Sequence, residues 1–215
     1  SPAPVLGMGE RMMDLRDIQA LFANGEQGGY WPADPAYLYE DSAGTIPASR
    51  DGVVGLLTNA VTGYPNAIQA TTANKPYLRR TPVSNKYWLD SNTTTGALTT
   101  TFASSLGSAC TIATVGAEGV VIADNQTVGT TYNICPPYNY SSDVLIINRA
   151  LTAAEKALVT RILKRNAPYY PSIVDARLQM RGYAPNNENT VDTSIITNFS
   201  YAWYGCSGLT SFPLI

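Results

Sequence analysis

The stretch VLIINRALTAAEKALVTRIL, residues 144–163, decides the fold because it joins a strand directly to a helix. Its four leading apolar residues complete a strand predicted over Asp143–Ile147. Thr152 and Glu155 then have the spacing of a capping box, in which Thr152 caps the helix and Glu155 reaches back to it. Pro168 ends this helix. The apolar face of the helix comprises Ala154, Leu158 and Ile162, with Leu151 and Val159 as further candidates.

Upstream of this unit, between residues 64 and 148, short strands alternate with turns. Several of these strands are rich in β-branched residues, and turn residues separate them at roughly the 8–12-residue spacing of an all-β sandwich. The predicted strands are Tyr77–Arg80, Tyr87–Asp90, Gly96–Phe102, Cys110–Val115, Gly119–Ala123, Thr130–Ile134 and Asp143–Ile147.

The N-terminal part adds a second helix and further extended pieces. Residues 14–24 predict a short helix that Asp14 caps and Gly25 stops. Residues 37–45 predict an extended piece that ends in a turn, and the apolar run 53–57 predicts a buried strand. Together these elements predict an all-β fold with short flanking helices.

Composition excludes several classes of function. Charged residues make up 14% of the chain, its net charge is −2, and it has no run of Lys or Arg. The chain therefore lacks the clustered positive charge that is typical of nucleic-acid-binding proteins. The chain has no histidine, which removes Ser-His-Asp and Cys-His catalysis as well as zinc sites that contain histidine. No apolar run approaches the roughly 18 residues of a membrane span.

The three cysteines, Cys110, Cys135 and Cys206, form no CxxC pair. Their odd number argues against a disulfide-stapled secreted scaffold, and buried apolar packing is the ordinary role of such residues. A disulfide between Cys110 and Cys135 stays open, because spacing alone does not decide it.

Carboxylates and tyrosines are the candidate functional groups. Glu40 and Asp41 lie beside a turn and lack the alternating pattern that would place a catalytic pair on one strand, so we expect no enzyme activity. Tyrosine is abundant, with 14 copies, and its amphipathic ring suits contacts with sugars or proteins. The candidate ligand-binding residues cluster in the segment YNICPPYNY and are Tyr132, Tyr138 and Tyr140.

Two strings near the N-terminus carry a resemblance to a known class of module. The string EDSAGT at residues 40–45 and the string QAT at residues 69–71 resemble a module common in phage and prophage structural proteins. The strand–helix at residues 144–163 is similar to the end of such modules. The resemblance implies a concanavalin A-like, laminin-G-type jelly roll. In relatives a histidine often precedes the longer string Ala-x-Gln-Ala-Thr, which is residues 67–71 here, whereas Asn66 stands at that place in this chain.

The C-terminal stretch TNFSYAWYGCSGLTSFP resembles one unit of the BspA-type leucine-rich surface repeats of adhesins. Such units stack on their neighbours, so we expect the native chain to continue beyond Ile215. The sequence therefore divides into an N-terminal segment with a short helix (1–27), a jelly-roll domain (28–167), a linker (168–190) and the start of a leucine-rich repeat (191–215).

Together the two resemblances imply a virion protein of a phage tail fibre or tail tip. We expect a lectin-like, receptor-binding role in adhesion to a host glycan or outer-membrane component, other tail proteins as partners, and a homotrimer. The location would be the virion tail or another extracellular surface. A purely architectural joining protein and a glycan hydrolase on a jelly-roll scaffold are the alternatives.

No cofactor is expected, although the laminin-G-type resemblance leaves calcium open as an alternative. The residues that could contribute to such a calcium site are Asp90, Asn92, Asp124 and Asn125.

Overall fold

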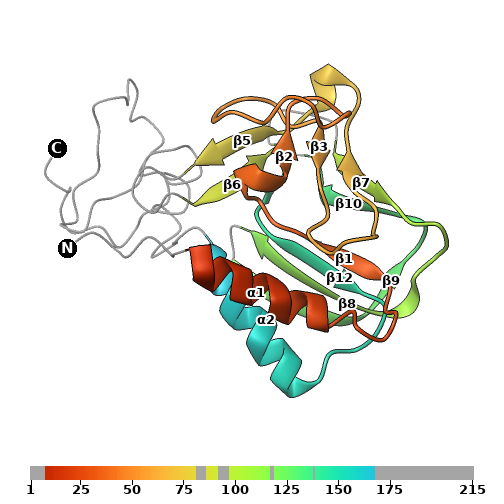
Figure 1. The fold of residues 1–215 in the computed structure, drawn as a ribbon. Coiled ribbons are helices and arrows are strands. Elements are labelled where there is room, and N and C mark those ends of the chain that lie inside the picture. The colour runs from red at the N-terminus through yellow and green to blue at the C-terminus, as the bar shows by residue number, and fades with distance from the viewer. Residues whose placement is uncertain (1–7, 81–85, 92–96, 117–118, 138, 168–215) are drawn as a thin grey trace, which may run out of the picture.

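The computed structural model describes residues 8–80, 86–91, 97–116, 119–137 and 139–167. These residues form three antiparallel sheets and a few helices, which confirms the predicted β-rich fold. Two layers of sheet pack face to face, and a pair of helices covers one of them (Figure 1). The predicted linker and leucine-rich repeat, residues 168–215, lie outside the described residues.

The first layer is a four-stranded sheet in the order β1-β12-β8-β9. The strands β8 and β9 form a long hairpin, and β12 lies between β8 and β1. The bounds of these strands are β1 Gly28–Trp31, β12 Val144–Ile147, β8 Gly107–Gly116 and β9 Gly119–Val128.

The second layer contains a five-stranded sheet in the order β10-β7-β4-β3-β2 and a three-stranded sheet in the order β11-β6-β5. The bounds in the larger sheet are β10 Thr131–Cys135, β7 Leu98–Thr101, β4 Ala67–Ile68, β3 Leu56–Leu57 and β2 Leu38–Tyr39. Those in the smaller sheet are β11 Tyr140–Ser141, β6 Tyr87–Asp90 and β5 Tyr77–Arg80. Short 3-10 helices span Pro35–Tyr37 and Thr72–Asn74.

One stretch of chain, residues 52–57, connects the two sheets of the second layer. An antiparallel bridge joins Val53 to Tyr77 of β5, and the amide of Leu78 donates to the carbonyl of Gly52. The same stretch then continues into β3. The two sheets therefore form one layer that faces the four-stranded sheet.

The apolar run in β12 is explained by its central position. Val144 and Ile146 pack in the core between the two layers, whereas Leu145 and Ile147 pack under the helices. Side chains alternate between the faces of a strand, so a strand that is covered on both faces must be apolar at every position. All four residues are buried.

The helices α1 (Met8–Ala20) and α2 (Ala153–Asn166) cover the outer face of the four-stranded sheet (Figure 1). The predicted capping box of α2 is confirmed, because Thr152 accepts from the amide of Glu155 and Glu155 accepts from the amide of Thr152. No helix in the described part of the chain is long and apolar enough to cross a membrane.

The prediction for the first helix was wrong about its start and its end. The helix begins at Met8 rather than at Asp14, and it ends at Ala20. Asp14 is therefore an internal residue, and its buried carboxylate accepts two hydrogen bonds from Arg165 of α2, at 3.0 and 3.1 Å. Gly25, with a φ of +87°, closes the turns that follow the helix.

Cys110 and Cys135 are free thiols in the core between the layers. Burial raises the pKa of the Cys110 thiol, and burial also raises the pKa of Cys135 to about 11. Both residues therefore act as small buried apolar groups, and the structure shows no disulfide between them.

Arg149 joins the end of β12 to both helices. Its guanidinium donates to Glu26 at 3.1 Å, to Glu155 at 2.8 and 3.0 Å, and to the carbonyl of Leu21 at 3.2 Å. The hydrogen bond from Arg149 lowers the pKa of Glu155 to about 2. The side chain thus fixes α1, α2 and the loop before α2 to one another.

We expect Arg149→Ala to lower the free energy of unfolding by about 2–3 kcal/mol, because two carboxylates and a carbonyl lose a charged donor. Urea denaturation followed by circular dichroism measures this loss. The matched control is Arg161→Ala, which breaks an exposed 3.7 Å pair with Asp17 and should cost less than about 0.5 kcal/mol. Equal losses in the two variants would contradict the role assigned to Arg149.

Candidate functional site

Tyr132, one of the predicted ligand-binding residues, lies on β10 at the edge of the five-stranded sheet. Its ring is half-buried and packs against the core between the layers, and burial raises the pKa of its hydroxyl. Its register partner is Thr100, a fully buried residue. Tyr132 therefore belongs to the inner face of this sheet.

Tyr140 lies on β11, in the three-stranded sheet, so the structure places it in a different sheet from Tyr132. Tyr138 lies outside the described residues. The tyrosine cluster of the sequence is thus divided between two sheets, and its role in ligand binding stays a prediction.

A distinct set of side chains lies on the face of the three-stranded sheet that points away from the core between the layers. Leu78 of β5 lies opposite Leu89 of β6, and both pack in the core between the layers. Side chains alternate along a strand, so the neighbours of these two leucines point to the outer face. We call this surface the tyrosine–arginine face; its residues are Tyr77, Arg79, Trp88, Asp90 and Tyr140.

Asp90 is the centre of the tyrosine–arginine face. The register places Asp90 opposite Tyr140 on one side and opposite Tyr77 on the other. Such directly opposed residues have Cβ atoms about 4.5–5.5 Å apart, so the carboxylate lies between two phenol rings. Both tyrosines are half-buried.

Arg79 connects the charged groups of this face. Its Nε donates to Asp90 at 3.2 Å and its Nη1 donates to Asp51 at 2.9 Å, while its guanidinium lies 5.0 Å from the centre of the Tyr77 ring. Burial lowers the pKa of Arg79, but the hydrogen bonds to the two aspartates outweigh this effect and raise it. The guanidinium is held on three sides.

Asp51 reaches the face from a turn with a left-handed backbone. Its φ is +63°, a value that aspartate adopts more readily than most residues, and its amide donates to the carbonyl of Leu78 at 2.7 Å. Gly52 follows and pairs with the same strand. The turn therefore fixes the Asp51 carboxylate beside Arg79.

Trp88 lies opposite Arg79 on the same face and is 1% exposed. It belongs to neither of the two apolar core clusters. Its indole Nε1 is buried and has no hydrogen-bond partner among the described residues. Because buried donors in native structures are nearly always satisfied, this N–H is an unusual feature of the face.

The residues considered for calcium do not converge. Asp90 belongs to β6 in the second layer, whereas Asp124 and Asn125 belong to β9 in the first, and Asn92 lies outside the described residues. Asp124 bonds Lys156 and Thr111, and the hydrogen bond from Lys156 lowers its pKa. Across the described ranges, no three or more His, Cys, Asp or Glu side chains are grouped so that they could hold a metal ion.

The adjacent pair Glu40 and Asp41 organises a loop. Asp41 accepts from the amides of Thr45 and Ile46, and these backbone bonds lower the pKa of its carboxyl. Glu40 accepts from the hydroxyl of Ser49 at 2.8 Å, and its carbonyl accepts from the buried Lys75 at 2.7 Å. The EDSAGT string that carries the family resemblance is thus the part of the chain that forms this closed loop.

A second titratable cluster is buried where β1, β12 and α2 meet. Asp143, which is 3% exposed, accepts from the Tyr30 hydroxyl at 2.5 Å, the Ala33 amide at 3.0 Å and the Asn166 amide at 3.1 Å. Burial raises the pKa of Asp143, although the hydrogen bond from Tyr30 opposes this effect. A perturbed carboxyl can mark an active site, but this one is enclosed by structural bonds, so we assign it to stability.

The raised pKa of Asp143 predicts a specific pH dependence. A carboxyl whose folded pKa exceeds its unfolded value stabilises the fold below the unfolded value, near pH 4, and this contribution is lost as the pH rises through the folded pKa. Asp143→Asn removes the titration and keeps the shape. We therefore expect the variant to gain stability relative to the wild type as the pH rises above about 4.

Urea denaturation at a series of pH values measures this difference. A difference that stays constant with pH, or that shrinks as the pH rises, would contradict the assignment. The control is Asp124→Asn, where a lowered pKa gives the opposite sign. Its wild-type advantage should be present above about pH 4 and be lost on acidification.

Sequence reasoning missed Tyr77, Arg79 and Asp51 as members of a site. The signal that could have found the first two was present, because Tyr77–Arg80 and Tyr87–Asp90 were predicted as strands with the bounds that the structure gives. Alternation within these strands already separates the two leucines from the polar residues. The register between the strands and the approach of Asp51 need the fold.

No family model, no curated protein and no solved structure matches the chain.

Proposed function

We propose that this chain is a virion protein of a phage tail fibre or tail tip, and that its β-sandwich contributes to recognition of the host surface. The sequence resemblance of residues 40–45, 69–71 and 144–163 supports the virion assignment. The observation that carries the recognition role is the tyrosine–arginine face, because aromatic rings beside a hydrogen-bonded charged pair are typical of binding surfaces. In this proposal the chain binds and does not catalyse.

The finer structural assignment is part of the same proposal. The sandwich is a concanavalin A-like jelly roll, and the sequence of residues 191–215 is one unit of a leucine-rich surface repeat. The partners are other tail proteins and a host glycan or outer-membrane component. The chain assembles as a homotrimer, and sedimentation as a monomer at micromolar concentration would contradict this part.

Two measurements test the proposed function. Gold-labelled antibodies raised against the purified chain should bind the tail end of intact particles from the source culture in electron micrographs. Excess purified chain should also block adsorption of these particles to their host cells. Particles without label at the tail, or adsorption that is unaffected by the free chain, would refute the proposal.

A purely architectural role is the second candidate, and one observation favours it. The strand β9 forms an edge of the four-stranded sheet, and its Val121 is 51% exposed. An edge strand with exposed apolar side chains can pair with another chain. In the architectural alternative, antibody label would lie between other tail proteins, and the free chain would not compete for host cells.

A further inference from the structure

The dipeptide Asn24–Gly25 lies in the turns that connect α1 to β1. It is the only asparagine–glycine pair in the sequence. Both residues are exposed, and Gly25 has a φ of +87°. An asparagine before a glycine is chemically labile, because glycine has no Cβ that would keep its amide nitrogen away from the asparagine side chain. The fold therefore presents a reactive pair to water.

Both reacting groups of this pair are weakly held. The Nδ2 of Asn24 lies 3.5 Å from a carboxylate oxygen of Glu26, which is the outer limit of a hydrogen bond. The amide of Gly25 donates to the carbonyl of Phe22 at 3.3 Å, which is also long. Among the described residues, no heavy atom except those of its chain neighbours lies within 4 Å of the position of a Cβ on Gly25. The Asn24 side chain thus has room to turn towards the Gly25 nitrogen.

Two other asparagines of the described chain show what distinguishes Asn24. Asn59 is held by hydrogen bonds from the amides of Tyr30 and Val61 and by a bond of its own to the carbonyl of Pro65. Asn125 is exposed and has a φ of +54°, but Gln126 follows it and its Cβ hinders the approach of the amide. Asn24 combines exposure and weak hydrogen bonds with a following glycine.

From these features we infer that Asn24 is a site of spontaneous deamidation. The Gly25 nitrogen attacks Cγ of Asn24 and loses its proton, a succinimide ring forms, and the Cγ–Nδ2 bond breaks as ammonia leaves. Water then opens the ring. Cleavage between Cγ and the Gly25 nitrogen gives aspartate, and cleavage between the main-chain carbonyl carbon and that nitrogen gives isoaspartate. Water is the only co-reactant, no electrons are transferred, and the inference does not depend on the proposed function.

The product carries a new negative charge beside Glu26. In the unmodified chain, the Glu26 carboxylate accepts from the main-chain amide of Asn24 at 2.9 Å and from Arg149 at 3.1 Å. Deamidation replaces the side-chain donor at position 24 by a carboxylate, which only accepts. Two like charges then lie close together and repel each other. The modification therefore disturbs the group of charges that fixes α1 and α2.

Isoaspartate also lengthens the main chain between two fixed points. Before the pair, Phe22 is 6% exposed and packs in the core under the helices. After the pair, the carbonyl of Glu26 accepts from the Tyr64 hydroxyl, and the amide of Gln27 donates to Asn148 at 2.8 Å. An additional methylene group in the main chain between these points displaces at least one of the contacts. We therefore expect the modification to loosen the connection of α1 to β1.

Incubation of the full chain at mildly alkaline pH, followed by tryptic digestion and mass spectrometry, tests the inference. Trypsin releases residues 17–50 as one peptide, in which Asn24 is the only asparagine. We expect this peptide to gain about 1 Da, as NH is replaced by O, and to contain isoaspartate. The reaction should be roughly tenfold or more faster than at Asn125. Its rate should rise with pH, because the attacking nitrogen must lose its proton.

The isolated peptide of residues 17–50 gives the reference rate without the fold. If the free peptide reacts and the folded chain does not, the bond from Gly25 to Phe22 protects the site and the inference is wrong. The inference is also wrong if neither sample reacts, or if Asn24 in the folded chain reacts no faster than Asn125.

Urea denaturation tests the structural consequence. Wild-type protein that has been aged until most of Asn24 has reacted should unfold at a lower urea concentration than fresh protein. Asn24→Gln changes an exposed side chain and should fold, and after the same ageing it should keep its midpoint, since glutamine forms the larger ring slowly. Asn24→Asp introduces the charge without the longer main chain, so it should lose less than the aged wild type. Equal losses in aged wild type and aged Asn24→Gln would overturn the consequence.

Discussion

Gly28→Ala is expected to prevent stable folding, with a loss of at least about 4 kcal/mol in the free energy of unfolding. A Cβ atom at this position would lie 2.0 Å from the carbonyl oxygen of Ile146, which is backbone of the central strand β12. The φ of Gly28 is +139°, a conformation that other residues rarely adopt. The strand β1 could accept the methyl group only by separating from β12.

The measurement is urea denaturation where the variant is soluble, and otherwise recovery in the soluble fraction beside the wild type. Gly129→Ala is the control, because no heavy atom lies within 4 Å of the position that its new methyl group would occupy, and the change should stay within about 0.5 kcal/mol. A Gly28→Ala variant as stable as this control would show that β1 does not pair with β12 as described.

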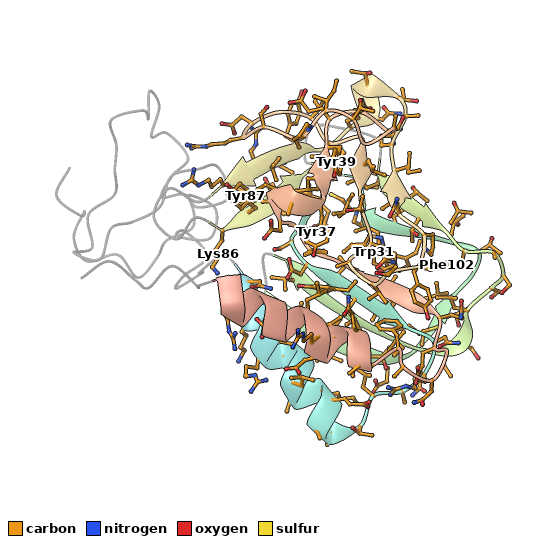
Figure 2. The ribbon with its side chains drawn as sticks, viewed as in Figure 1. Trp31, Tyr37, Tyr39, Lys86, Tyr87 and Phe102 are labelled. Atoms are coloured by element: carbon orange, nitrogen blue, oxygen red, sulfur yellow. The ribbon has the colours of Figure 1, made fainter. Side chains whose placement is uncertain are left out.

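Trp31→Ala should cost about 3–5 kcal/mol, because it removes one of the largest fully buried side chains in the core between the layers. The indole ring meets Phe102 edge to face, with centroids 6.4 Å apart, and its Nε1 donates to the carbonyl of Pro65 at 3.2 Å. Figure 2 shows Trp31 and Phe102 at the same end of the sandwich. The substitution therefore opens a cavity and removes the donor from a carbonyl.

Chemical denaturation of Trp31→Ala and Trp31→Phe separates these effects. The phenylalanine variant keeps an aromatic ring and should recover part of the loss, although it also lacks the N–H donor. Val121→Ala truncates a side chain that is 51% exposed and should cost less than about 0.5 kcal/mol. If Trp31→Ala matched Val121→Ala, the core between the layers would not depend on this residue.

The elements that could be predicted are those whose signals lie within a few residues. The capping box of α2 and the bounds of β5 and β6 follow from local side-chain patterns, and the structure confirms them. The strand β1 escaped prediction because two glycines begin it and Pro32 follows it. The strands β4 and β11 have two residues each, which is too short for any periodicity to appear.

The candidate site depended on contacts that the sequence does not encode locally. Tyr140 could be singled out from its tyrosine-rich surroundings, and alternation within the predicted strand places Tyr77 and Arg79 on one face, but only the register of three strands places Tyr77 and Tyr140 on the two sides of Asp90. The bond between Arg79 and Asp51 joins residues 28 positions apart. The separate register of β10 with β7 places Tyr132 on an inner face, which the spacing of the three tyrosines could not show.

The pairing of α1 with α2 has a mechanical consequence for how the sandwich can be attached. The last turn of α2 bonds Asp14 in the middle of α1, Arg161 one turn earlier pairs with Asp17, and the two helices therefore run in opposite directions, so the start of α1 and the end of α2 lie at the same end of the helix pair (Figure 1). A domain whose entry and exit are adjacent can be inserted into a longer chain without a break in its own fold.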